Sequence, residues 1–241
     1  MSNIAELEKK VDYLLKEVER LQSVNDLQRL MGKYMTCHVR SNRDDVLSLK
    51  TSWRFFANRA DSSAEIADHG VFIGIDNIRK MYEGIFAPGP TEGCMYEHNL
   101  ATPQIVVAED GQTARGLWQS PGHETDPRMS DDPNGIGKPV ATWVWGRIAA
   151  DFIKENGEWK IWHYHWYRLF RCPFDKSWVD YVPSAIQKGG AKNHPAFANL
   201  DIPERSRETT YHNVYGVNVE LESVPPSPEP YATWTEDREL P

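Results

Sequence analysis

The stretch WKIWHYHWYR, residues 159–168, consists largely of aromatic and imidazole side chains and contains neither glycine nor proline. Such a run is typical of a β-strand, in which successive side chains point to opposite faces of a sheet. Asn156-Gly157 stands just before it and predicts the tight turn of a hairpin. The sequence therefore predicts a long final strand paired with the apolar run at 140–154.

Strict alternation along this strand predicts two aromatic faces. One face would carry Trp159, Ile161, His163, His165 and Tyr167. The other would carry Lys160, Trp162, Tyr164, Trp166 and Arg168. Lys160 indicates that its own face begins near water, so we expect the histidine face to line an internal cavity and the other face to be covered by a second subunit. Arg168, at the end of the strand, could still reach the cavity.

Elements earlier in the chain extend this pattern. The runs at 96–107 and 113–120 are β-branched or aromatic and are separated by a turn sequence, Glu109-Asp110-Gly111. Before them, helices are predicted from residue 25, over 45–56 and from residue 75, with a strand around 65–71. Helices followed by an antiparallel meander predict an α+β fold in which three helices cover one face of a curved sheet.

The first 24 residues carry a heptad repeat. Its members, at spacings of 3, 4, 3, 4 and 3, are Ile4, Leu7, Val11, Leu14, Val18 and Leu21. β-Branched residues at one position and leucines at the other favour two parallel strands of a coiled coil. Leu15 and Val24 widen the stripe, so a trimer, or packing against the chain's own body, also fits. We expect an oligomerisation helix at 1–24, an α+β domain at 25–178 and an irregular extension at 179–241 that wraps the domain or a neighbouring subunit.

Composition excludes several classes of function. The chain has 241 residues, of which 40% are hydrophobic and 26% are charged, and no apolar run approaches the length of a membrane span. A net charge of −8 repels nucleic acid. The first ten residues are too charged for a secretory signal, and three widely spaced cysteines indicate reduced thiols. We expect a cytoplasmic homo-oligomer, a dimer or a trimer, that binds neither nucleic acid nor membrane.

Motifs for nucleotide or serine-hydrolase chemistry are missing from the sequence. His163 and His165 share a strand face and resemble half of a metal site, for which His98, His123 or Asp68 could supply a third ligand. No glutamate completes a familiar metal-binding spacing, so we expect hydrogen-bonded histidines and no metal.

Several segments together resemble the SnoaL-like group of the nuclear-transport-factor-like superfamily. They are the helix at 25–34 after the heptad leader, Asp68-His69-Gly70 with Gly74, His98 at the start of a strand, the segment 114–118 and the hairpin at 156–161. The leader is also similar to that of bacterial bile-acid 7α-dehydratases, and the long tail to that of lignin diarylpropane formaldehyde-lyases. The resemblance implies a cone of curved antiparallel sheet capped by helices, and cofactor-independent catalysis by a tyrosine and a histidine near a carboxylate.

Matched position by position, the family's tyrosine falls on Tyr34 and its histidine on His98. The carboxylate does not carry over. One aspartate of the bile-acid dehydratases falls on Val39, beside His38, and the other falls near Gly122, beside His123. A substrate other than a bile acid is therefore expected.

These residues predict a lyase, either a dehydratase or a C–C/C–O lyase, that acts on an aromatic or polycyclic alcohol such as a phenolic lignin-type compound. Histidine suits proton transfer near neutral pH, and tyrosine can stabilise a developing phenolate. The expected catalytic residues are Tyr34, His98 and His123. The expected substrate-binding residues are His38, Asp68, Trp118, Trp145, His165, Tyr167 and Arg168. A cyclase or isomerase, or a non-catalytic binding module, fits the same scaffold, and core packing alone would also account for Tyr34.

Overall fold

The computed structural model describes residues 2–39, 41, 43–67, 69–86, 92–125, 139–180, 201–210 and 213–235. Its elements, in chain order, are α1 (Ser2–Thr36), the 3₁₀ helix η1 (Leu49–Phe55), β1 (Ser63–Ile66), β2 (Val71–Ile73), α2 (Ile75–Ile85), β3 (Met95–His98), β4 (Ala101–Val107), β5 (Thr113–Thr125), β6 (Ala141–Glu155) and β7 (Glu158–Pro173). Among these residues, no helix is both long and apolar enough to cross a membrane.

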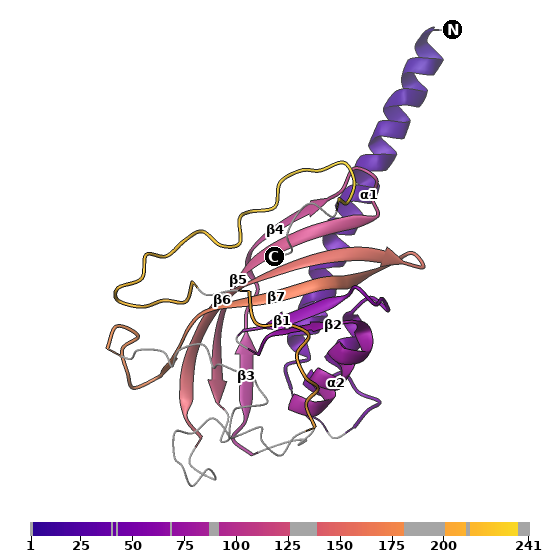
Figure 1. Cartoon of the computed structure of the whole chain (residues 1–241). Coiled ribbons are helices and arrows are strands. Elements are labelled where there is room, and N and C mark those ends of the chain that lie inside the picture. The colour runs from indigo at the N-terminus through magenta and orange to yellow at the C-terminus, as the bar shows by residue number, and fades with distance from the viewer. Residues whose placement is uncertain are drawn as a thin grey trace.

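A curved seven-stranded sheet dominates the structure (Figure 1). Its strands run in the order β2-β1-β7-β6-β5-β3, and β4 also pairs with β5. The pairing of β1 with β7 is parallel, and the other pairings are antiparallel. Because β5, β6 and β7 are long and consecutive, they form a broad surface on which the helices can pack. The predicted α+β fold, a curved antiparallel sheet packed by three helices, is confirmed.

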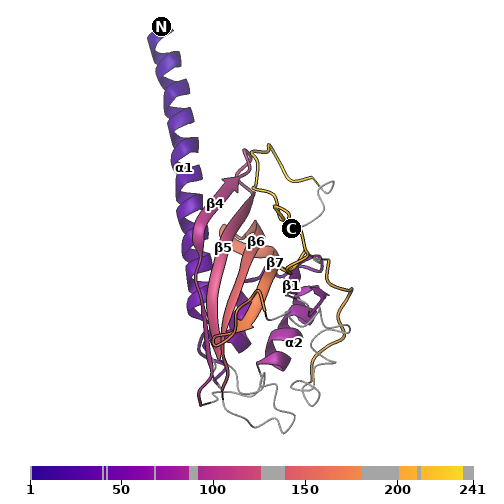
Figure 2. The same ribbon diagram turned by 90° about the vertical axis from the view of Figure 1, so that its left-hand side faces the viewer.

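The main core lies between the concave face of the sheet and the helices. Leu27 and Met31 of α1, and Ile78 and Met81 of α2, are fully buried there against Phe152 of β6. Burial of these apolar side chains fixes both helices on the same face. Figure 2 shows α1 on one side of the sheet and the C-terminal segment on the other.

Two irregularities in the pairing of β6 with β7 change which side chains face the core. Asp151 pairs with His163 and Phe152 with Ile161, so Trp162 is an extra residue. Ile161 and Tyr164 therefore both face the helices, whereas strict alternation would separate them. The prediction that the histidine face lines the interior is wrong, because this bulge turns His163 and His165 to the outer face.

The outer face is covered by the chain's own C-terminal segment. Val214 and Val224 pack against Tyr167 there, and the Tyr231 ring lies over the Arg115 guanidinium with the ring centroid 4.4 Å from Cζ. Glu65 binds the segment through its carboxylate, which accepts hydrogen bonds from the Thr210 N–H and hydroxyl. A second subunit was expected over the face that begins with Lys160, but Tyr164 and Trp166 of that face pack in the core against the helices instead.

Some elements differ from their predicted limits. The helix predicted over 45–56 is the shorter η1, and the strand expected around 65–71 is replaced by β1 and β2. The run at 96–107 divides into β3 and β4, while β5 continues five residues beyond its predicted end. The helix predicted to begin at residue 25 continues the N-terminal helix without a break, and its burial against the body begins near Ser23.

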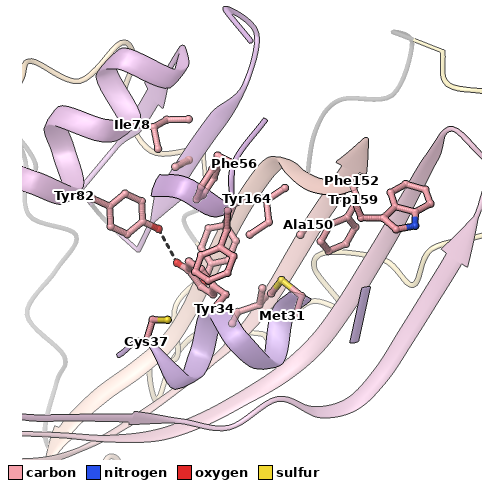
Figure 3. Close-up of a cluster of buried hydrophobic side chains, with 14 of the residues drawn as sticks. Met31, Tyr34, Cys37, Phe56, Ile78, Tyr82, Ala150, Phe152, Trp159 and Tyr164 are labelled. Atoms are coloured by element: carbon pink, nitrogen blue, oxygen red, sulfur yellow. Dashed lines mark hydrogen bonds between the residues drawn. The ribbon is translucent and has the colours of Figure 1, made fainter. Parts of the chain in front are cut away.

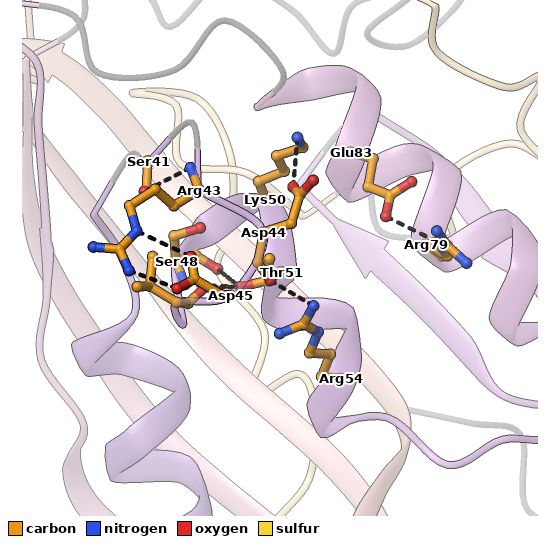
Figure 4. Close-up of polar contacts among 11 residues, drawn as sticks. Ser41, Arg43, Asp44, Asp45, Ser48, Lys50, Thr51, Arg54, Arg79 and Glu83 are labelled. Atoms are coloured by element: carbon orange, nitrogen blue, oxygen red, sulfur yellow. Dashed lines mark hydrogen bonds and ion pairs between the residues drawn. The ribbon is translucent and has the colours of Figure 1, made fainter.

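The segment between α1 and η1 is held by polar contacts (Figure 4). Arg54 donates to the carbonyl oxygen of Asp44, and the Lys50 ammonium lies 2.8 Å from the Asp44 carboxylate. The Thr51 side chain accepts a hydrogen bond from the Ser48 backbone N–H and so closes the first turn of η1. These contacts fix the chain just after the end of α1, where the candidate site begins.

Candidate functional site

Three tyrosines from three elements meet in the core. The hydroxyls of Tyr34 in α1 and Tyr82 in α2 form a hydrogen bond of 2.6 Å, and the Tyr164 ring of β7 lies 5.2 Å from the Tyr34 ring (Figure 3). All three side chains are buried. Burial raises the pKa of each phenol above its ordinary value, and the neighbouring phenols raise those of Tyr34 and Tyr164 further. They remain neutral hydrogen-bond donors over the physiological pH range.

His38 lies just past the last turn of α1. Its Nδ1 is 3.0 Å from the carbonyl oxygen of Met35 and 3.2 Å from that of Tyr34. Carbonyls only accept hydrogen bonds, so Nδ1 carries the proton and Nε2 is left as an acceptor. Burial, followed by the charge of His98, lowers the pKa of His38 to about 4. This imidazole is therefore neutral at pH 7.

His98 and Glu124 form the central pair of the site. His98 is the last residue of β3, and its Nε2 lies 2.9 Å from Oε1 of Glu124 on the neighbouring strand β5. The other carboxylate oxygen lies 3.0 Å from Nη2 of Arg171. The side chains of His98, Glu124 and Arg171 keep 6%, 10% and 18% of their surface exposed, so the group is enclosed but not sealed from solvent.

Charge keeps Glu124 ionised despite its burial. Burial alone would raise the pKa of this carboxyl, but the positive charge of Arg171, the hydrogen bond from His98 and the charge of Arg168 outweigh it and lower the pKa to about 2. An ionised carboxylate accepts a hydrogen bond from Nε2, so in the neutral form of His98 the proton lies on Nε2. The nitrogen left to accept a proton is Nδ1.

A second irregularity in β7 brings the two arginines together. Gly146 pairs with Arg168 and Trp145 with Phe170, so Leu169 is an extra residue. Arg168 and Arg171, three positions apart, therefore share the concave face, and both act on the charge of Glu124. Without this bulge, one of them would point outward.

Gly122 provides the space that His98 occupies. A Cβ at this position would lie 2.6 Å from Nδ1 of His98 and 2.7 Å from the carbonyl oxygen of Glu97. We expect Gly122→Ala to displace the imidazole and to lower the free energy of unfolding by about 1–3 kcal/mol. Gly32→Ala in α1 meets nothing within 4 Å and should raise the same free energy by up to about 1 kcal/mol. Urea unfolding of both variants tests the contrast, and equal stabilities would contradict it.

Acid should destabilise the fold through His38. The unfolded chain binds a proton at an ordinary histidine pKa of about 6.5, while the folded chain does so only near 4. The free energy of unfolding contributed by this group therefore falls as pH drops from 6.5 towards 4. Unfolding curves recorded between pH 7 and pH 4 should show a smaller loss in His38→Asn than in the parent protein. Identical losses would show that His38 is not held neutral.

Glu124 adds a step at lower pH. Its folded pKa of about 2 lies below the ordinary value of 4.5, so its stabilising contribution is complete above pH 4.5 and is lost as pH falls towards 2.

The structure gathers some of the residues predicted from the sequence and separates others. Tyr34, His38 and His98 lie in a row, with ring centroids 5.4 and 5.8 Å apart, and Arg168 acts on the same site. Trp118 lies deep in the core against Phe152. Asp68 falls outside the described residues.

Four predicted residues lie on the outer face instead. They are His123, Trp145, His165 and Tyr167. His123 is exposed and packs on Trp143, because odd-numbered residues of β5 point away from the helices. His165 stacks on Tyr167 beneath the C-terminal segment. The structure therefore does not bring these four to His98.

Sequence reasoning missed Glu124, Arg171, Tyr82, Tyr164 and Trp166. Glu124 was the most accessible to prediction, because it follows Gly122 by two residues and so shares its strand face. The strand predicted at 113–120 stopped before Pro121, so Gly122 and Glu124 were not expected to share a strand face. Among the described residues, no group of three histidine, cysteine, aspartate or glutamate side chains is placed to hold a metal ion.

The chain has a helix-capped curved sheet with a histidine–carboxylate pair on its concave face. Its sequence also matches a known protein family. Residues 19–165 match the SnoaL-like domain. Because the match spans more than half of the chain, the protein belongs to the SnoaL-like family. A comparison with curated proteins gives no significant match.

Solved structures share the fold at low sequence identity. One from Novosphingobium aromaticivorans, provisionally described as a scytalone dehydratase, is 15% identical over 67% of this chain and 93% of its own, with a TM-score of 0.47. LinA is 11% identical over 70% of this chain and 99% of its own, with a TM-score of 0.50. An NTF2-like protein of cystatin-like fold from N. aromaticivorans is 14% identical over 68% and 90%, with a TM-score of 0.41. At 11% identity, the likeness to LinA concerns the fold alone.

Proposed function

We propose that this protein is a cofactor-independent lyase, a dehydratase or a C–C/C–O lyase, that acts on an aromatic or polycyclic alcohol. The observation that carries the proposal is the His98 imidazole, which is hydrogen-bonded through Nε2 to an ionised Glu124 on the concave face. A histidine oriented by a carboxylate is a general base suited to neutral pH. Membership of the SnoaL-like family supports the same reading.

In the proposed elimination, Nδ1 of His98 takes a proton from the carbon next to the one that bears the leaving hydroxyl. The electron pair of that C–H bond forms the new double bond, and the C–O bond breaks. The hydroxyl leaves as water after taking up that same proton from the His98 imidazolium, so the imidazole returns to its starting form. Glu124 stabilises the imidazolium formed at His98, because its negative charge is already in place before the reaction begins.

Aromatic side chains around the pair favour a flat, apolar substrate. The Trp166 ring lies 5.2 Å from His98, and Phe86 lies 6.4 Å from Tyr96 of β3. Among the described residues, the buried Trp166 Nε1 and Ser120 Oγ have no hydrogen-bond partner. Oxygen atoms of a phenolic alcohol would satisfy such donors, so we favour a substrate with several hydroxyls, such as a phenolic lignin-type compound.

A phenolic substrate also allows C–C cleavage. Loss of the benzylic hydroxyl from a para-hydroxyphenyl alcohol gives a quinone methide, in which the ring oxygen has become a carbonyl. Deprotonation of a neighbouring primary alcohol can then break the C–C bond: formaldehyde leaves, and the bonding electron pair returns the ring oxygen to a phenolate. Arg168 and Arg171 lie where they would stabilise negative charge that develops on the substrate.

The test is product analysis with a panel of phenolic diols. Incubation with the protein should give a product lighter than the substrate by one water, or by one water and one formaldehyde where the C–C bond is also cleaved, with new conjugated absorbance. A product of unchanged mass would identify a cyclase or isomerase instead. Binding without any product would indicate a ligand-binding module. We further propose a cytoplasmic location, which is supported by three cysteines that are all free thiols.

A further inference from the structure

The N-terminal half of α1 extends away from the body (Figure 1, Figure 2). It carries an exposed apolar stripe. The stripe, here called the seam, consists of Ile4, Leu7, Val11, Leu14, Val18 and Leu21, and 46% to 65% of each residue is exposed. Soluble proteins rarely leave so continuous a row of large apolar side chains in water. The seam is thus an interaction surface that none of the described residues of the chain covers.

The part of the body that the structure describes does not cover the seam. The buried side of α1 is defined by Leu27, Met31 and Tyr34. At 3.6 residues per turn, that side and the seam lie about 160° apart around the helix axis. The next two positions of the heptad pattern, Asn25 and Gln28, are exposed and polar. The apolar row therefore ends where the body begins. Packing of the seam on the body, which the sequence alone left open, would require the helix to break.

We propose that the seam pairs with the seam of a second copy of this chain in a parallel, two-stranded coiled coil. Ile4, Val11 and Val18 occupy one heptad position and the three leucines occupy the other, the arrangement that favours parallel dimers. Asn25 takes the next place in the β-branched series, where a polar residue specifies the pairing register.

The side chains that flank the seam are compatible with a second, parallel copy of the helix. In a parallel pair, Lys10 of one copy lies beside Leu15 of the other, and Glu17 lies beside Gln22. No like charges oppose each other, and the methylene groups of Lys10 can cover Leu15. The remaining surface of the helix carries ions of both signs, including the pair Lys10–Glu6 at 2.9 Å, which favours a water-exposed outer face over a lipid surface.

Size and preorganisation are consistent with a stable dimer. Two seams with their flanking residues would bury on the order of 1,000 Å², near the lower end of specific interfaces. A free helix of this length would be marginal in water. Here the helix continues into residues that are already fixed in the core. Little conformational entropy is therefore lost when two copies associate. The two bodies would lie on opposite outer sides of the coil.

The expected result is a dimer of the intact protein in sedimentation-equilibrium ultracentrifugation at micromolar concentration, with twice the chain mass of 27.7 kDa. Leu14→Glu places two carboxylates face to face in the seam and should reduce the mass to that of one chain, with unchanged circular dichroism. The matched control, Lys16→Glu, puts the same residue on the outer side and should stay dimeric. A monomeric or trimeric parent protein, or a dimeric Leu14→Glu, would overturn the proposal.

The orientation has its own test. Val18→Cys, in a Cys94→Ser background in which the remaining native thiols, Cys37 and Cys172, are buried, should form an interchain disulfide on mild oxidation, because identical positions meet in a parallel pair. Leu21→Cys mixed with a separate Ile4→Cys protein should not give a heterodimeric cross-link. The reverse pattern would show an antiparallel pair and would contradict the parallel arrangement.

Discussion

His98→Ala is expected to lower turnover by on the order of 10²-fold or more while leaving the substrate's KM within a few-fold. The imidazole is the only group that Glu124 orients for proton transfer among the described residues, and alanine keeps the strand but removes the base. Steady-state kinetics on whichever phenolic diol the product assay identifies would measure the loss. His123→Ala is the informative companion, since His123 lies exposed on the other face of the sheet. A normal kcat in His98→Ala with loss in His123→Ala would reverse the assignment.

Glu124→Gln should cause a loss of about 10²-fold in kcat, because the amide carries no charge to stabilise the imidazolium of His98. It also leaves Arg171 without its carboxylate, so the neighbouring positive charges oppose protonation of His98. The charge-matched control is Glu97→Gln, which removes an exposed carboxylate from the adjacent position of β3. If both variants retain turnover within two-fold of the parent, Glu124 takes no part in the reaction.

Much of the fold could be predicted from residue patterns. The aromatic run at 159–168 and the Asn156-Gly157 turn correctly predict the β6–β7 hairpin. The helix at 75–85 was also predicted from its start at Ile75. These patterns are local, and local patterns fix the type of an element well.

The candidate site was harder to predict, because it depends on pairing register. Trp162 and Leu169 are extra residues in β7, and nothing in the period-two pattern marks them as bulges. Each bulge places the residues that follow it in β7 on the sheet face opposite to the one that alternation continued from the residues before it predicts. The first bulge moved His163 and His165 away from the core, and the second placed Arg171 on the same face as Arg168.

The missing carboxylate shows a different limitation. The family's aspartates suggested positions near Val39 and Gly122, whereas the structure pairs His98 with Glu124. Strand β3 pairs His98 directly with Gly122, so a carboxylate two residues further along the same face comes within reach of the imidazole. This relation depends on a pairing between strands that no spacing along the sequence reveals.

The proposed reaction requires that Glu124 fix the tautomer of His98, so that this imidazole can accept a proton at Nδ1. Nitrogen-15 NMR of uniformly labelled protein at pH 7 tests it without knowledge of the substrate, with the His98 signals assigned by their absence in His98→Ala. For the neutral form of His98 we expect a proton on Nε2 and an unprotonated Nδ1, a pattern that changes in Glu124→Gln. A proton on Nδ1 with a free Nε2, or signals that Glu124→Gln leaves unchanged, would contradict it.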